Sequence, residues 1–235
     1  MTQFADVALF PLFAIQALWV VARAERLPEP PGPRSGVGGD GPDLRLLILG
    51  DSSAAGVGAE RQEDALSGQL ARVLCPHVRL HWQLEAATGA TTASAAARLA
   101  TLPRQPIDAA LVVLGANDVT RLSDLSRVLE RRIEIANRLR EDFGASNVVM
   151  TGVPPMGVFP LLPRPLRGRL GQRAARLDRA LTEAAPQAGF QYLPFTLPFR
   201  PDYMARDGFH PAPLAYRVWA ETLGPHLLPG PSALP

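Results

Sequence analysis

The chain of 235 residues contains no lysine, one cysteine and few aromatic side chains. All of its basic residues are arginine, and a formal charge of +2 is too small to indicate a nucleic-acid-binding surface. The single cysteine, Cys75, excludes an internal disulfide, and its position before Pro76 is typical of a structural thiol. No His, Cys and acidic residues have the spacing of metal ligands, so the sequence predicts no metal and no cofactor.

A clean hydrophobic run of full bilayer length is also missing. The apolar stretch Val7–Val21 is shorter than the roughly 20 residues of a spanning helix, and Pro11 and Gln16 interrupt it. No basic residue precedes the stretch, which disfavours a cleaved signal peptide. We therefore expect residues 1–25 to form an uncleaved membrane anchor or interfacial helix, in contact with the membrane through residues 4–22. An apolar helix packed on the domain is the alternative.

The composition after this stretch defines the remaining domains. Arg23 and Arg26 follow the apolar run and, under the positive-inside tendency, predict a membrane-associated domain on the cytoplasmic side; a periplasmic or secreted protein is the alternative. Residues 26–43 are rich in proline and glycine and are predicted to be a linker. One α/β domain is expected over residues 44–228, followed by a tail at 229–235.

From Leu44 onward, apolar strand-like runs alternate with helical patterns. The predicted strands are Leu44–Leu49, Val78–Leu84, Ala109–Leu114, Asn147–Val153 and Gln191–Leu193. The predicted helices are Ala65–Leu74, Thr92–Leu102, Leu125–Phe143, Leu166–Ala185 and Pro213–Leu228. Nearly continuous apolar strands separated by helices indicate a parallel sheet that is covered on both faces. Ligands of such sheets bind beyond the carboxyl ends of the strands, so the loops there are the candidate site.

The first predicted strand ends in an unusual stretch, "LRLLILGDSSAAGVG". A phosphate-binding P-loop is disfavoured, because five residues separate Gly50 from Gly56 and no lysine follows. Asp51 is a weak candidate for metal-assisted phosphoryl transfer, because the next acidic residue is Glu60. The remaining chemistry is an exposed nucleophile, Ser52, in a turn of small residues.

A serine nucleophile requires a base and donors for an oxyanion. Gly89 and Asn117 each follow a predicted strand, where a backbone N–H and a side-chain amide can serve as donors. Asp207 precedes His210 by three residues, close enough to hold the imidazole with one ring nitrogen free to accept a proton. Each residue alone has an ordinary structural explanation, but their combination at successive strand ends favours a hydrolytic site.

The stretches "GDSSAAG", "ATGATT", "GANDV" and "DGFHP" resemble the four signature blocks of the SGNH (GDSL-type) hydrolase family, over residues 44–228. The resemblance implies a flavodoxin-like three-layer α/β/α sandwich with a five-stranded parallel sheet. It also implies Ser52 as nucleophile, His210 as base and Asp207 as the residue that orients it. Ser52 N–H, Gly89 N–H and the Asn117 side chain would form the oxyanion hole. Ser53 is the only nearby rival nucleophile.

We therefore predict an esterase or lipase-like enzyme that hydrolyses carboxylic esters through an acyl-serine intermediate. An acyltransferase with the same site and a membrane-tethered, non-catalytic binding module are the alternatives. The substrate is expected to be a lipid or other apolar ester, with sugar acetyl esters left open. Candidates for the acyl pocket are Met156, Phe159, Leu161 and Leu162, which could equally pack beneath their loop. Five arginines of the following helix form either a solvated face or a surface for anionic lipid headgroups.

Overall fold

The structure is a computed structural model that describes residues 2–229, with side chains from residue 11 onward. Six strands form one sheet in the order β1-β3-β2-β4-β5-β6, and β2 to β6 are parallel. The strands are β1 (Ser35–Gly38), β2 (Asp43–Gly50), β3 (Arg79–Ala86), β4 (Ala109–Val113), β5 (Asn147–Thr151) and β6 (Gln191–Leu193). The predicted strands are therefore present, and their ends differ from the predicted bounds by at most two residues.

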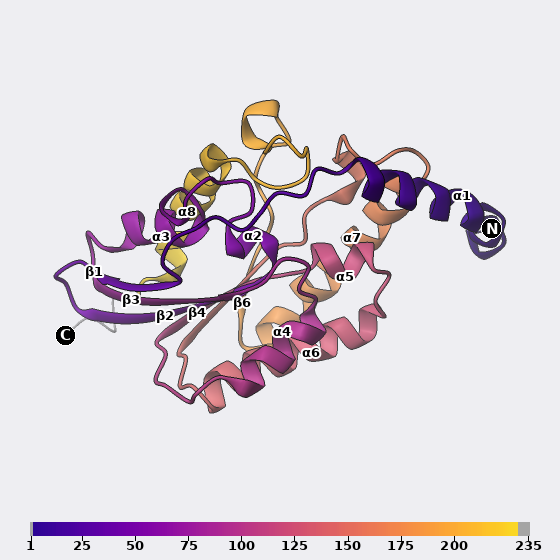
Figure 1. Cartoon of the computed structure of the whole chain (residues 1–235). Coiled ribbons are helices and arrows are strands. Elements are labelled where there is room, and N and C mark those ends of the chain that lie inside the picture. Colours follow the sequence, from indigo (N-terminus) through magenta and orange to yellow (C-terminus); the bar gives the residue numbers. More distant parts are fainter. Residues whose placement is uncertain (1, 230–235) are drawn as a thin grey trace.

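Helices cover the sheet on both sides (Figure 1). The helices are α1 (Thr2–Arg23), α2 (Ser52–Ala55), α3 (Leu66–Leu74), α4 (Thr92–Thr101), α5 (Ala116–Thr120), α6 (Leu125–Glu141), α7 (Leu166–Ala188) and α8 (Pro213–Leu227). One hydrophobic core lies between the sheet and α3 and α8, and a second lies between the sheet and α4, α6 and α7. The predicted three-layer α/β/α sandwich is confirmed. It follows from strands such as β4, which is buried on both faces at every residue.

The sheet has six strands rather than the five expected, because part of the predicted linker is ordered. β1 lies within residues 26–43 and pairs antiparallel with β3 at the edge of the sheet. Next to it, the Leu84 N–H donates to the Arg34 carbonyl at 2.7 Å. Pro30 is buried, and a Cβ built on Gly56 would lie 3.0 Å from its Cγ. Strand pairing uses backbone groups that every residue has, so a proline- and glycine-rich composition did not reveal it.

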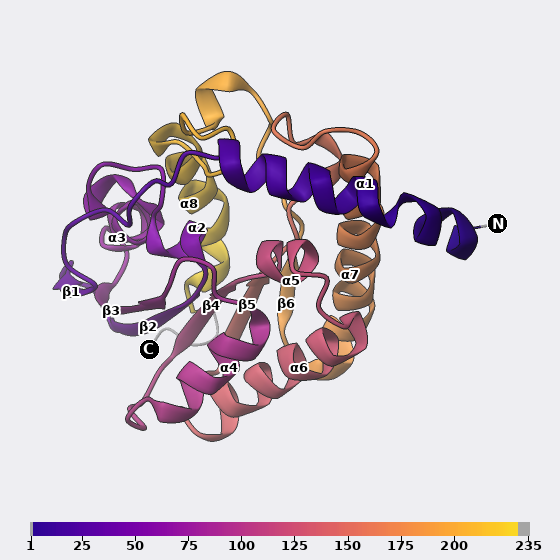
Figure 2. The ribbon, with the colours of Figure 1, turned by 45° about the vertical axis from the view of Figure 1, so that its right-hand side comes forward.

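Helix α1 lies across the edge of the molecule where the parallel strands end, next to α7 (Figure 2). Phe13 and Val20 pack against the core. Gln16 Nε2 donates to the Arg164 carbonyl at 2.6 Å, and Gln16 Oε1 accepts the Leu166 N–H at 3.1 Å. Within the described residues, no helix combines the length and hydropathy required to cross a bilayer. The side chains of residues 4–10 and the predicted tail from residue 230 lie outside the described part of the chain.

Candidate active site

Ser52 is the first residue of α2, directly after β2. The Asp51 carboxylate caps this short helix by accepting the Ser53 N–H at 3.0 Å. A Cβ built on Gly50 would lie 2.5 Å from Ala54 Cβ and 2.6 Å from the Val113 carbonyl oxygen, so the turn requires glycine there. The small residues around Ser52 thus allow the chain to reverse tightly against β4, and they place the hydroxyl at the carboxyl edge of the sheet.

The structure brings together the three residues predicted to perform catalysis. His210 Nε2 lies 2.8 Å from Ser52 Oγ, although 158 residues separate them along the chain. On the other side of the ring, His210 Nδ1 lies 2.5 Å from Asp207 Oδ2. The Asp207 side chain is almost fully buried, and that of His210 is 16% exposed. Ser52 can therefore pass a proton to a ring that a buried carboxylate holds in place.

Two carboxylates near the nucleophile have opposite pKa shifts. Burial alone would raise the Asp207 pKa, but hydrogen bonds from the His210 side chain and from the His210 and Phe209 N–H groups outweigh it, so the pKa lies below its ordinary value. Burial raises the pKa of Asp51 to about 6, against the lowering effect of the Ser53 N–H. Asp207 is consequently the carboxylate suited to stabilise a protonated His210, while Asp51 organises the turn.

The two predicted oxyanion donors occupy neighbouring loops. Gly89 has φ +79°, in a turn closed by the Ala90 N–H and the Ala87 carbonyl at 3.0 Å. Among the described residues, no hydrogen bond uses the Gly89 N–H, which leaves it available to a ligand. Asn117 Nδ2 donates to the Ala90 carbonyl at 3.0 Å, which orients its amide toward the same loop. The second hydrogen on Asn117 Nδ2 is then free to bind a substrate oxygen.

Two buried charged residues behind these loops, Asp118 and Arg132, were not predicted from the sequence motifs. Asp118 accepts the Thr92 N–H at 3.1 Å and the Thr92 hydroxyl at 2.7 Å, so it links α5 to the start of α4. Arg132 is fully buried, and it donates to the Leu114 carbonyl at 2.8 Å. Burial lowers the pKa of Arg132, while Asp118 counteracts that effect. The helical periodicity of the sequence could have indicated that Arg132 is buried, because it occupies a core-facing position of α6 between buried apolar residues.

The predicted acyl-pocket residues do not share one environment. Met156 and Leu162 are buried within the core next to α7. Phe159 is buried in the same core, and it also lines a small cavity of about 30 Å³ beside α2, together with Phe209. The Phe209 ring lies 5.3 Å from the His210 ring and 5.1 Å from the Phe159 ring, measured between centroids. Only Phe159 of the four candidates lines this aromatic cavity, which adjoins the catalytic residues.

A larger hollow of about 1060 Å³ lies under β1, β3 and β2, lined by residues such as Leu47, Gln83 and Arg98. Neither Ser52 nor His210 lines it, so the site is assigned by the geometry of its polar groups and not by the size of the cavity. In the part of the chain that the structure describes, no three His, Cys, Asp or Glu side chains lie together as metal ligands would.

A serine, a histidine and an aspartate in hydrogen-bonded sequence at the carboxyl edge of a parallel sheet form the arrangement that serine hydrolases use. Residues 48–218 match the GDSL-like lipase/acylhydrolase family, and the chain belongs to it. This membership confirms the resemblance that the four sequence blocks indicated.

Known relatives agree with this assignment. The chain is 33% identical over 192 residues to the "GDSL-like esterase Rv1075c" of Mycobacterium tuberculosis, and the match covers 77% of this chain and 60% of the relative's length. Among solved structures, TesA superposes with a TM-score of 0.65 at 24% identity, covering 78% of this chain and 98% of TesA. The psychrotrophic esterase EstA from Pseudoalteromonas sp. superposes with a TM-score of 0.58 at 20% identity, covering 78% of this chain and 96% of EstA. At these identities, the structural matches show a shared fold.

Proposed function

We propose that the protein hydrolyses carboxylic esters by acyl transfer to Ser52. The observation that supports this proposal most directly is the continuous hydrogen-bonded set from Ser52 Oγ through His210 to Asp207. A hydroxyl in this arrangement becomes nucleophilic as its proton moves to His210 Nε2. The name of the mycobacterial relative supports the same reaction.

The proposed reaction has two steps. Ser52 Oγ attacks the ester carbonyl while His210 takes its proton, and the negative charge on the carbonyl oxygen is bound by the N–H groups of Ser52 and Gly89 and by the Asn117 amide. The leaving alcohol receives the proton from His210, which produces the acyl-serine ester. Water then attacks this ester while His210 takes a proton from the water. The bond between the acyl carbon and Ser52 Oγ breaks, His210 returns the proton to Ser52, and the acid is released. Asp207 stays ionised and stabilises the protonated ring throughout.

The size of the aromatic cavity supports short acyl groups. Its volume of about 30 Å³ is roughly that of one or two water molecules, too small for a long chain. Phe159 and Phe209, which line it, present apolar surface next to the base. We therefore propose an ester whose acyl group has about two carbons, a narrower class than the apolar or lipid esters expected from the sequence.

The chain-length dependence of p-nitrophenyl ester hydrolysis tests this proposal. We expect kcat/KM to be highest for acetate and to fall at least about tenfold by octanoate, because the longer chain does not fit beside Phe159. Replacement of Phe159 by alanine should shift the optimum to longer chains. A laurate optimum in the wild-type protein would contradict the short acyl pocket.

Two further measurements test the alternative functions. Product that appears as an acceptor ester instead of the free acid would identify an acyltransferase. Absence of any labelling by a serine-directed phosphonate would indicate a binding module.

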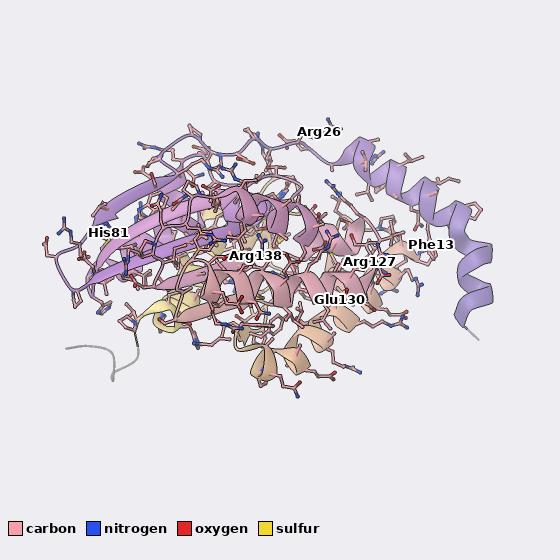
Figure 3. The ribbon with its side chains drawn as sticks, turned by 90° about the horizontal axis from the view of Figure 1, so that it is seen from below. Phe13, Arg26, His81, Arg127, Glu130 and Arg138 are labelled. Atoms are coloured by element: carbon pink, nitrogen blue, oxygen red, sulfur yellow. The ribbon has the colours of Figure 1, made fainter. Side chains whose placement is uncertain are left out.

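We further propose that α1 rests on the surface of an anionic membrane. Residues 11–22 contain no charged side chain, and their large exposed apolar residues are Leu12, Ile15, Leu18, Trp19 and Val21. Phe13 lies on the side of α1 that faces the domain, so the exposed set points away from it (Figure 3). Arg23 stacks over Trp19 at 4.8 Å, and Arg26 follows. An apolar helix face that ends in an aromatic ring and basic groups complements the interface of a bilayer with anionic headgroups. The cytoplasmic side stays a prediction.

Vesicle sedimentation tests the membrane proposal. Wild-type protein should bind vesicles that contain phosphatidylglycerol more tightly than vesicles of phosphatidylcholine alone. Leu18 is 70% exposed in the protein, so it is free to insert its apolar side chain into the membrane. Leu18→Glu removes this apolar contact and should lower the partition coefficient about tenfold or more. Val37→Glu is the matched control, since Val37 is 61% exposed on the edge strand β1, away from α1. Equal binding by both variants, or no binding by the wild type, would refute the proposal.

A further inference from the structure

The turn that contains Gly89 is exposed, and the N-terminal segment holds it in place. Ala87 and Thr88 are both exposed to solvent. Glu29 Oε1 accepts the Thr88 N–H at 2.7 Å and the Thr88 hydroxyl at 2.8 Å. Glu29 lies 59 residues earlier in the chain, before the segment that matches the family. The residue directly before the oxyanion glycine is therefore anchored through both its backbone and its side chain by a distant carboxylate.

The carboxylate is itself fixed by a neighbouring guanidinium. Arg34 Nη1 donates to Glu29 Oε2 at 3.0 Å, and Arg34 Nη2 donates to the Ala86 carbonyl at the end of β3. Glu29 and Arg34 thus form hydrogen bonds with the backbone at residues 88 and 86, on either side of Ala87. The Arg34 carbonyl also accepts the Leu84 N–H, which ties the pair to the sheet. Because Glu29 holds the loop at Thr88 and Arg34 holds the end of β3 at Ala86, the pair restrains the loop relative to β3.

We propose that Glu29, supported by Arg34, is a positioning residue that holds the Gly89 N–H in the orientation required to bind the oxyanion. The peptide unit that bears this N–H begins at the Thr88 Cα, so anchoring the Thr88 N–H and hydroxyl restrains the direction of the donor. The Asn117 amide restrains the other side of the turn through Ala90. The inference rests on the proposed function, because it assigns a role in the ester hydrolysis performed at Ser52.

The role predicts a specific kinetic change. An oxyanion donor acts on the transition state, and its loss costs about 10²- to 10³-fold in kcat. A donor that is present but poorly held should cost less, so Glu29→Ala should lower kcat about tenfold with less than a threefold change in KM. Thr88 is exposed, and water can replace the lost hydrogen bonds, so the melting temperature should change by only a few degrees. Glu29→Gln keeps an oxygen that accepts the Thr88 N–H but loses the charged pair with Arg34, so it should keep about half of the wild-type kcat.

The experiment compares wild type, Glu29→Ala, Glu29→Gln and Ser52→Ala on p-nitrophenyl acetate, with hydrogen exchange of the peptide over residues 86–91 as a second readout. Glu25→Ala is the matched control. Glu25 belongs to the same segment, but its carboxylate pairs at 2.9 Å with exposed Arg206 rather than with Thr88. Glu29→Ala alone should lower kcat and speed exchange of the turn.

Three results would overturn the inference. They are a Glu29→Ala kcat within twofold of wild type, an equal loss in Glu25→Ala, or an unchanged exchange rate in the turn. If Glu29→Ala does not fold, an unchanged kcat and exchange rate in Glu29→Gln with an unchanged melting temperature would overturn it as well, because loss of the Arg34 pair should still cost about twofold. Absence of Ser52-dependent hydrolysis in the wild type would instead refute the proposed function, while the exchange measurement would still report on the turn.

Discussion

Replacing Ser52 by alanine is expected to lower kcat for p-nitrophenyl acetate by about 10⁴- to 10⁶-fold, because the variant has no oxygen to attack the ester. The fold should be retained, since the serine side chain is small and its hydrogen bond within the site goes only to His210. Steady-state hydrolysis measures the loss, and peptide mass spectrometry after reaction with a serine-directed phosphonate locates the modified residue. The expected adduct is on Ser52 in the wild type and missing in the variant.

The neighbouring hydroxyl provides the matched comparison. Ser53 contacts Asp51 through its backbone N–H, which Ser53→Ala retains. This variant should keep at least about a tenth of wild-type activity and the full phosphonate adduct on Ser52. Hydrolysis that survives Ser52→Ala but disappears in Ser53→Ala would make Ser53 the nucleophile and would contradict the proposed mechanism.

Replacing Asn117 by alanine should lower kcat by about 10²- to 10³-fold with little change in KM. The amide hydrogen that faces away from the Ala90 carbonyl binds the oxygen mainly after it has become negative, so the loss falls on the transition state. Steady-state kinetics on the acetate ester separates kcat from KM. The variant also loses the hydrogen bond to Ala90, so its melting temperature must be measured beside its activity.

Asn137→Ala is the matched control for this prediction. Asn137 lies on α6 and accepts a hydrogen bond from Arg140 Nη2 at 2.6 Å, away from the catalytic residues. Its activity should stay within about twofold of wild type. A change in KM alone for Asn117→Ala would mean that Asn117 binds the substrate in its ground state and is not an oxyanion donor.

Much of the fold was predictable because its signals are local. The apolar runs that became β2 and β4 and the helical patterns between them repeat along the chain, and parallel strands connected by helices have few possible arrangements. Of the site, Ser52, Gly89 and Asn117 were predictable because each follows a strand of that sheet. The edge strand β1 was missed, because its pairing with β3 depends on backbone bonds that composition does not encode.

The residues of the acyl pocket were also not predictable from the sequence, because side-chain packing decides which of them line it. Met156 and Phe159 are three residues apart in one apolar loop, and sequence patterns cannot distinguish them. In the structure, Met156 and Phe159 are buried in the same core, but only Phe159 also contacts the Phe209 ring near His210. Which apolar side chain forms a pocket is decided by the neighbours it meets, and those come from distant parts of the chain.

The sequence by itself determined the fold class and the family, and it supplied the candidates for nucleophile, base and oxyanion donors. These depend on residue type and on order along successive strands. Only the tertiary structure decided that His210 reaches Ser52, that the Arg132 charge is buried behind the loops, and that Glu29 grips the turn before Gly89. Those contacts join residues separated by many positions, and their distances depend on how the helices and strands pack, which no local pattern specifies.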